Sequence, residues 1–508
     1  MHRGAIAVVL ATTVLLAGCA TITWDDATTT TDDPDPAGPD PARDVLGWED
    51  GFWHNDSIAV DQTDGLNDSE LQAYVARGMA RVEYIRNREF KSDVPVTVIS
   101  RDQYRSRTTG DVAPAYRAWN NQVWEGLWIV GEDTDVAAAL SSTRGSAVAG
   151  FYSPSNDAIT IITPTPSEPT ISNATLIHEL VHALQDQYVG LGNPRFGGRT
   201  QDAQLAADGL IEGEANYVEA RYSQRCGGAW QCVAPADTGD GGGLPADFNF
   251  GLFVTIFQPY SDGPVWVDHI IERGGWQAFN RYYSAVPTST EQIIHTTQEE
   301  PVGVTVATTA TDGWERFPDQ GVDGADTVGE ASIYAMFWYQ SRTYGADVLD
   351  WRAINDVDNP LDTYNYSSPP SRGWANDVLV PYRNQRGEDT DYGYVWKTVW
   401  DTERDATQFR QAYLEVLAAH NATRLDPGTW VVPSGPFADA FRITRNGSTV
   451  TIVNGPSTAA LADIHPRTTD PTETTTQSTT TGATGPGFGL AAALVAVVLA
   501  ALPRWRSE

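Results

Sequence analysis

The sequence predicts an α+β fold on three observations. A β-hairpin is expected at residues 151–162, where two strand-forming runs flank the turn residues 154–157. Two helices are expected directly after it, at about 172–188 and 201–222, from their apolar spacing. No internal repeat interrupts this mixture of helices and strands.

The remaining elements extend the same mixture along the chain. A capped helix is expected at 68–90, where apolar residues recur at three- and four-residue steps, and a β-branched strand follows at 94–99. The rest is predicted to be a mainly helical part followed by a small C-terminal α/β segment. Its elements are helices at 264–284, 327–342 and 404–420, and strands at 393–400 and 440–453.

The charge balance restricts the possible partners. The chain has 66 acidic and 33 basic residues, a net charge of −33, and only two of the basic residues are lysines. Such a surface repels nucleic acid and anionic lipid, so neither is expected as a partner. The 17 Trp, 20 Tyr and 15 Phe indicate a folded core, not an acidic disordered protein. The composition resembles that of haloarchaeal secreted proteins, which implies adaptation to high salt.

Both ends of the chain are expected to be targeting and anchoring segments that lie outside the folded region. Residues 1–19 form a predicted export signal whose last four residues, ending in Cys19, resemble a lipobox and make Cys19 the expected lipidation site. Residues 20–45 are a Thr/Asp/Pro tether and 461–485 a Thr-rich stalk. This leaves 46–460 as the globular region.

Residues 486–508 are expected to form a second anchor. They begin with Pro-Gly-Phe, continue into an apolar stretch and end near two arginines, which resembles the haloarchaeal sorting signal that an archaeosortase cuts. A simple C-terminal anchor remains an alternative and gives the same location. The sequence therefore predicts an extracellular protein attached to the membrane by lipid, by its C-terminus, or by both.

The cysteines and sequons fit this location. Cys226 and Cys232 flank a short glycine-containing loop and are expected to form a disulfide, although two free thiols remain possible. They make a poor zinc pattern because no third ligand lies near them. Six Asn-x-Ser/Thr sequons are candidate glycosylation sites, namely Asn55, Asn67, Asn173, Asn365, Asn421 and Asn446.

The segment that carries chemistry is His-Glu-Leu-Val-His at residues 178–182. On a helix, His178 and His182 lie one turn apart on one face and can hold one ion, for which Zn²⁺ is the expected metal. Glu179 lies beside them, within reach of a water molecule that the ion activates, and is the expected general base. Two core histidines bonded to backbone carbonyls are the structural alternative.

With the acidic cluster at 212–219, the chain resembles the gluzincin metallopeptidases. That resemblance implies a zincin-like core made of a hairpin with an edge strand, an active-site helix and a glutamate helix. It makes Glu212 the expected third zinc ligand and Asn216 an expected orienting residue, although the family usually has aspartate at that position. Glu214 remains the competing ligand, and Glu219 is expected on a solvated face.

A wider resemblance joins the chain to metallopeptidase sequences that share the motifs at 178–187, 212–215 and 289–295. It makes His295 a candidate catalytic residue that holds the developing oxyanion. A histidine bonded to a neighbouring loop is the alternative for His295, and Glu330 is open between a helix cap, a domain contact and substrate binding.

The predicted function is therefore a cell-surface zinc-dependent hydrolase of peptide bonds, with a peptide or protein as substrate. Two other functions remain open: a catalytically silent surface protein on the same fold, and a zinc hydrolase of a non-peptide amide. The sequence predicts neither the cleavage preference nor the oligomeric state.

Overall fold

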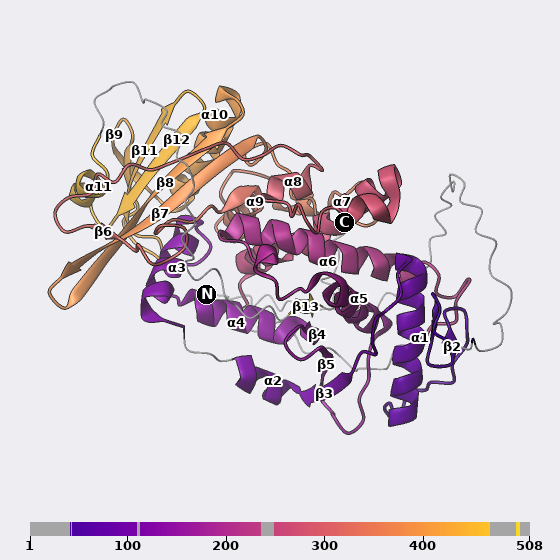
Figure 1. Ribbon diagram of the computed structural model, residues 1–508. Helices are drawn as coiled ribbons and strands as arrows, with labels where there is room; N and C mark the ends of the chain where they lie inside the picture. The colour runs from indigo at the N-terminus through magenta and orange to yellow at the C-terminus, as the bar shows by residue number, and fades with distance from the viewer. Residues whose placement is uncertain (1–40, 42, 109–111, 235–247, 468–493, 498–508) are drawn as a thin grey trace, which may run out of the picture.

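The computed structural model describes residues 41, 43–108, 112–234, 248–467 and 494–497. The chain is mixed α+β, as predicted. A mainly helical part with a four-stranded sheet is followed by a large antiparallel sheet, drawn in orange and yellow in Figure 1. Cys19 and most of the N-terminal tether, of the stalk and of the C-terminal anchor fall outside the described residues.

Helices dominate the first part of the described chain, and its longest strands lie nearer the C-terminus. The helices are α1 (Asp68–Arg86), α2 (Arg101–Thr108), α3 (Pro114–Gly126), α4 (Val136–Ala147), α5 (Asn173–Val189), η1 (Pro194–Phe196), α6 (Gln201–Ser223), α7 (Phe250–Phe279), α8 (Thr290–Ile294), α9 (Gly329–Thr343), η2 (Trp351–Asn355), α10 (Glu403–Ala419) and α11 (Thr458–Ile464). The strands are β1 (Trp48–Glu49), β2 (Phe52–Trp53), β3 (Val96–Ser100), β4 (Val148–Ser153), β5 (Ala158–Thr163), β6 (Glu315–Arg316), β7 (Trp374–Arg386), β8 (Asp389–Trp400), β9 (Thr423–Asp426), β10 (Thr429–Val431), β11 (Ala440–Asn446), β12 (Thr449–Gly455) and β13 (Leu494–Val497).

The four-stranded sheet lies beside the helix that carries the two histidines. Its order is β13-β4-β5-β3, with β4 and β5 as an antiparallel hairpin and β3 parallel to β5. The predicted hairpin is therefore confirmed, and α5 follows it. The Tyr152 hydroxyl on β4 donates to Asp186 on α5 over 2.9 Å, which ties the hairpin to the helix.

The prediction of a small C-terminal α/β segment is wrong. Within the described residues, β6 to β12 form a seven-stranded antiparallel sheet with the order β6-β7-β8-β12-β11-β10-β9. Its longest strand, β7, was not predicted, because asparagines, arginines and a proline interrupt the β-branched residues. The predicted strand 440–453 is in fact the hairpin of β11 and β12.

Helix predictions were most accurate around the histidines. Both α5 and α6 lie within one residue of their predicted bounds, whereas α1 ends at Arg86, four residues early, because Asn87 adopts a left-handed conformation (φ 53°). α7 begins at Phe250, earlier than predicted, and Gly275 breaks its helical geometry. α2, α3 and α4 were not predicted.

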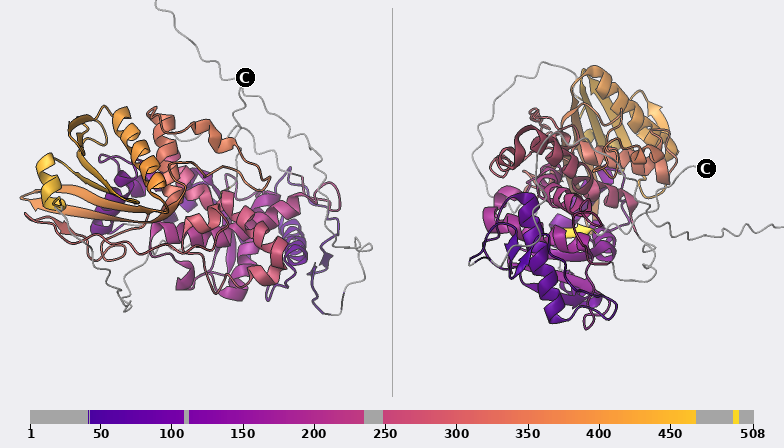
Figure 2. Two further views of the ribbon diagram at one scale, coloured as in Figure 1. Left: turned by 90° about the horizontal axis from the view of Figure 1, so that it is seen from above. Right: turned by 90° about the vertical axis from the view of Figure 1, so that its right-hand side faces the viewer.

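Helix α7 joins the two main hydrophobic cores. Its first half packs with the large sheet, α3, α9 and α10, and its second half packs with α1, α5, α6 and the small sheet. Figure 2 shows the resulting elongated body, with the large sheet in orange and yellow at one end and the magenta and purple helices toward the other. The histidine helix is thus buried in the second core.

The described ends of the globular region refine the predictions. The predicted boundary at residue 460 falls inside α11, whose Leu461 and Ile464 are buried against the large sheet. The predicted disulfide between Cys226 and Cys232 is present. Among the described residues, no helix combines the length and the apolar character needed to span a membrane.

Two glycines allow α6 and α7 to approach closely. A Cβ atom on Gly213 would lie 2.6 Å from the backbone of Gly263, so only glycine fits there. Gly213 stands between Glu212 and Glu214, and this contact therefore sets the depth at which both carboxylates enter the core.

We predict that Gly213→Ala lowers the free energy of unfolding by about 1–3 kcal/mol, because the added methyl group overpacks the crossing of the two helices. Chemical denaturation measures the change. Gly192→Ala is the control, since a Cβ there meets no atom within 4 Å. Equal stability of the two variants would show that the close contact is not required.

Candidate metal centre

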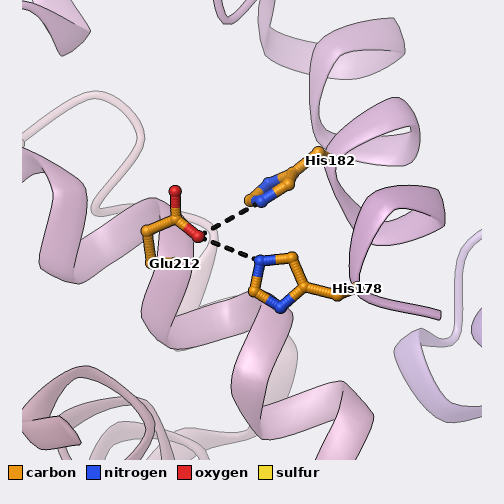
Figure 3. A group of neighbouring side chains, drawn as sticks. All are labelled: His178, His182 and Glu212. Atoms are coloured by element: carbon orange, nitrogen blue, oxygen red, sulfur yellow. Dashed lines mark hydrogen bonds and ion pairs between the residues drawn. The ribbon is translucent and has the colours of Figure 1, made fainter. Parts of the chain in front are cut away.

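Helix α5 presents His178 and His182 on one buried face. Ser172 caps the helix by accepting a hydrogen bond from the Thr175 backbone, and its apolar residues fill the surrounding core. The two imidazoles are 2% and 0% exposed, and their ring centroids lie 4.7 Å apart at an interplanar angle of 79°. Both rings face α6, as Figure 3 shows.

Glu212 on α6 meets both imidazoles through a single oxygen. Its Oε2 lies 3.0 Å from His178 Nε2 and 3.3 Å from His182 Nε2 (Figure 3). His182 Nε2 makes no well-directed hydrogen bond within the described residues despite this proximity. The ligand atoms of these three residues all lie within 4.8 Å of one another. Three donors from two helices thus converge on one point.

The opposite nitrogen of each imidazole faces an acceptor, through a hydrogen bond in His182 and a longer charged contact in His178. His182 Nδ1 lies 2.8 Å from Gln185 Oε1, and His178 Nδ1 lies 3.5 Å from Glu219 Oε2. An acceptor at Nδ1 favours the tautomer with hydrogen on that atom, which leaves the Nε2 lone pair free. Both Nε2 atoms face Glu212, and a metal bound there would replace the Nε2 proton of His178.

The charges at this point favour a cation. Burial alone lowers the pKa of His178, but its hydrogen bonds to Glu212 and Glu219 outweigh burial and raise that pKa to about 10. Burial opposes ionisation of Glu212 too, yet the adjacent His182 and His178 lower its pKa to about 2. Two imidazole nitrogens and one carboxylate are a ligand set that suits Zn²⁺ and leaves its fourth position open. The residues fit the predicted metal.

Glu179, next to His178 on α5, has a buried side chain whose hydrogen-bonding capacity is not satisfied within the described residues. Its side chain is 0% exposed, and within the described residues neither carboxylate oxygen has a hydrogen-bond partner that meets normal geometry. Burial raises the pKa of Glu179 to about 7, while the neighbouring His182 and His178 pull it down. A buried carboxylate without a partner is costly, and such groups are concentrated at functional sites.

Glu214, the competing third ligand, points into a different network. It accepts hydrogen bonds from Arg86 and Tyr283, and from Gln185 Nε2 over 2.7 Å. Its charge is thereby matched by a buried guanidinium. Through Gln185, this network also fixes the ring of His182.

The structure corrects two predictions about α6. Asn216 Nδ2 donates to the Tyr260 carbonyl over 2.9 Å, so the expected bond from Asn216 to a ligand histidine is not seen. Glu219, expected on a solvated face, instead orients His178. It lies two helical turns after Glu212, so the spacing on α6 could have revealed it.

Tyr260 on α7 is a site residue that the sequence analysis missed. Its ring stacks near His178, with centroids 6.3 Å apart. Burial, the charge of Glu212 and a hydrogen bond to Glu212 raise its pKa well above the usual range, so the phenol keeps its proton. No sequence motif includes Tyr260, and the segment between α6 and α7 has no recognisable pattern that would relate this tyrosine to the histidines.

His295 is paired with Glu330. Its Nε2 lies 2.9 Å from Glu330 Oε2, and within the described part of the chain this carboxylate is its side-chain partner. Burial alone lowers the pKa of His295, but the bond to Glu330 reverses this effect and raises it. The structure does not bring His295 into contact with His178, His182 or Glu212, and its catalytic role stays a prediction.

We predict that Gln185→Ala weakens zinc binding about 10–100-fold, because His182 loses the acceptor that selects its tautomer. Competition with a chromophoric chelator measures the dissociation constant. Gln187→Ala is the matched control, since Gln187 lies on the same helix but bonds Lys91 and Ser92. Unchanged affinity in the Gln185 variant would contradict this orienting role.

Comparisons with known proteins cover only the C-terminal part of the chain, which contains the large sheet, α9, α10 and α11. A family described as a domain of unknown function (DUF8575) matches residues 315–465. This range runs from β6 to α11 and does not include His178, His182 or Glu212. No curated protein and no solved structure matches the chain. Over these residues, the chain is similar to a family whose function is not described.

Proposed function

We propose that the protein is a zinc-dependent hydrolase of peptide bonds with a zincin-like core. The observation that carries the proposal is the convergence of His178 Nε2, His182 Nε2 and one oxygen of Glu212 beside the unpaired, buried carboxylate of Glu179. Two satisfied core histidines would explain neither the shared carboxylate oxygen nor the unpaired glutamate. The hairpin, α5 and α6 form the proposed core.

Each residue of the proposed centre has a separate role in binding the metal or in catalysis. His178, His182 and Glu212 would hold the ion, while Gln185 and Glu219 orient the two imidazoles. When bound, zinc supplies Lewis-acid activation of water and of the substrate carbonyl. The Glu179 carboxylate takes a proton from the attacking water and passes it to the leaving amine.

Tyr260 is the proposed donor to the developing oxyanion. Its phenol is protonated and lies next to Glu212, on the side of the centre formed by α7. A hydroxyl that donates more strongly to the charged transition state than to the neutral carbonyl lowers the barrier. His295, whose described partner is Glu330, is the second candidate for this role.

The edge of β4 supports an extended peptide as substrate. β13 pairs antiparallel with β4 along residues 148–152, so this edge carries backbone groups that accept an added strand. The backbone of Tyr152 on β4 is near enough to Glu179 to lower its pKa, so this edge lies next to the proposed base. A peptide paired with β4 would run past the catalytic carboxylate.

An extracellular, membrane-anchored location is part of the proposal. The disulfide between Cys226 and Cys232 supports it, because such bonds persist in oxidising compartments. The excess of acidic residues supports exposure to high salt.

We predict that Glu179→Gln keeps the zinc and lowers kcat/KM for peptide hydrolysis by about 10²–10⁴-fold, because the amide cannot take the proton. Zinc content by plasma mass spectrometry and digestion of a peptide library measure the two effects. Glu89→Gln, an exposed change near α1, is the control. Undiminished hydrolysis by the Glu179 variant would refute the mechanism, and a zinc-loaded wild type without hydrolysis would favour a catalytically silent protein.

We predict that Tyr260→Phe lowers kcat about 10²–10³-fold with little change in KM, because only the transition state loses a hydrogen bond. Steady-state kinetics on a peptide cleaved by the wild type measures both constants. His295→Gln is measured in parallel. A large loss of kcat in the His295 variant alone would assign the oxyanion to His295 instead.

A further inference from the structure

A second acidic cluster lies where α3 meets the large sheet. It consists of Glu125 at the end of α3, Glu132 in the following loop, and Asp439 just before β11. One oxygen from each carboxylate lies within 4.8 Å of the others. Glu125 and Asp439 are only 4% and 6% exposed, whereas Glu132 is exposed. Like charges are therefore brought together in a largely buried place.

No cationic side chain among the described residues offsets these charges. None of the three carboxylates forms an ion pair there, and Arg117, which lines the same cavity, pairs with Asp135 at 3.3 Å. Burial and then the charges of Asp439 and Glu132 raise the pKa of Glu125 well above its usual range. Burial, followed by the charge of Glu132, raises the pKa of Asp439 to about 8. The simplest explanation for three neighbouring carboxylates without a cationic partner is that a cation binds between them.

A buried amide oxygen points to a ligand at the same place. Gln122 is 5% exposed and lines the cavity with the three carboxylates. Its Nε2 donates to Glu125 Oε2 over 2.6 Å, which brings the amide to the cluster, yet its Oε1 has no hydrogen-bond partner within the described part of the chain. An unsatisfied buried carbonyl oxygen is unfavourable unless something accepts its lone pairs. A metal ion does so.

The chemical type of the ligand atoms indicates which class of metal ion the cluster would bind. All of them are oxygens, with no histidine or cysteine among them, so they suit a hard cation and not zinc. Ca²⁺ binds oxygens at about 2.3–2.6 Å, so two ligands on opposite sides lie up to about 5 Å apart. The smaller Mg²⁺ demands near-ideal octahedral geometry and gives up its water reluctantly, whereas Ca²⁺ accepts an irregular set of side-chain oxygens, so this cluster favours calcium. The cavity of about 1020 Å³ leaves room for water to complete the shell.

We propose that Gln122, Glu125, Glu132 and Asp439 form a calcium site that fastens the N-terminal helical part to the large sheet. The site stands independently of the proposed peptidase activity. It lies at a seam where the Glu132 backbone donates to the Pro436 carbonyl over 3.0 Å. Calcium there links α3 and its loop to β11, two segments far apart in the sequence whose side chains share one core.

The experiment measures the melting temperature of the full chain in chelator, in CaCl₂ and in MgCl₂, all at one high ionic strength. Calcium is expected to raise the melting temperature of the wild type, and magnesium to raise it less. Glu125→Gln and Asp439→Asn should remove the calcium response. Asp133→Asn, which removes a charge from the same cavity but outside the cluster, should keep it. All variants retain His178, His182 and Glu212, so zinc affects them equally.

Comparing the melting temperatures of the variant and the wild type in chelator and in calcium distinguishes the loss of the calcium site from damage to the fold. In chelator, Glu125→Gln should melt at or above the wild-type temperature, because it relieves repulsion between buried carboxylates. In calcium, the order should reverse. Calorimetric titration should show one calcium site in the wild type that Asp439→Asn weakens at least about tenfold, since affinity follows ligand charge.

Three results would overturn the proposal. The first is an equal calcium response in the wild type and in Asp439→Asn. The second is an equal response to magnesium and calcium, which would indicate general screening of the acidic surface. The third is a loss of the response in Asp133→Asn that matches the loss in the cluster variants.

Discussion

The meeting of two imidazoles and one carboxylate oxygen in a closed core is the constraint on which the rest of the site depends. Each imidazole uses Nε2 toward Glu212 and Nδ1 toward an orienting residue, so both rings are held from two sides. Burial makes these polar groups costly without a partner. A cation at their meeting point would satisfy all three, with Glu179 near enough to interact electrostatically with both histidines.

The surrounding fold secures this geometry through contacts far apart in the sequence. The close approach of Gly213 and Gly263 sets the depth of α6, and the pair of Arg86 and Glu214 ties α6 to α1. The first half of α7 enters the core of the large sheet and also brings Tyr260 to His178, and its second half packs in the core around α5 and α6. The match to the family of undescribed function ends at this sheet and does not reach the site.

The local part of the site could be predicted from the sequence, and the distant part could not. The spacing of His178 and His182 on a capped helix predicted their shared face, and the resemblance to the gluzincins singled out Glu212 from the acidic residues of the next helix. The role of Glu219 was misjudged, although its position two helical turns after Glu212 puts both carboxylates on the face of α6 that meets α5. Tyr260 and the calcium cluster combine segments with no local pattern, and β7 was missed because buried polar residues interrupt its apolar ones.

The most direct test of the central claim is X-ray absorption at the zinc edge, on protein loaded with one equivalent of zinc. The account predicts a low-coordinate shell of nitrogen and oxygen with the outer-shell scattering of two imidazoles, altered in Glu212→Gln and preserved in Glu214→Gln. A spectrum without imidazole scattering, or one that changes with Glu214 and not with Glu212, would contradict it.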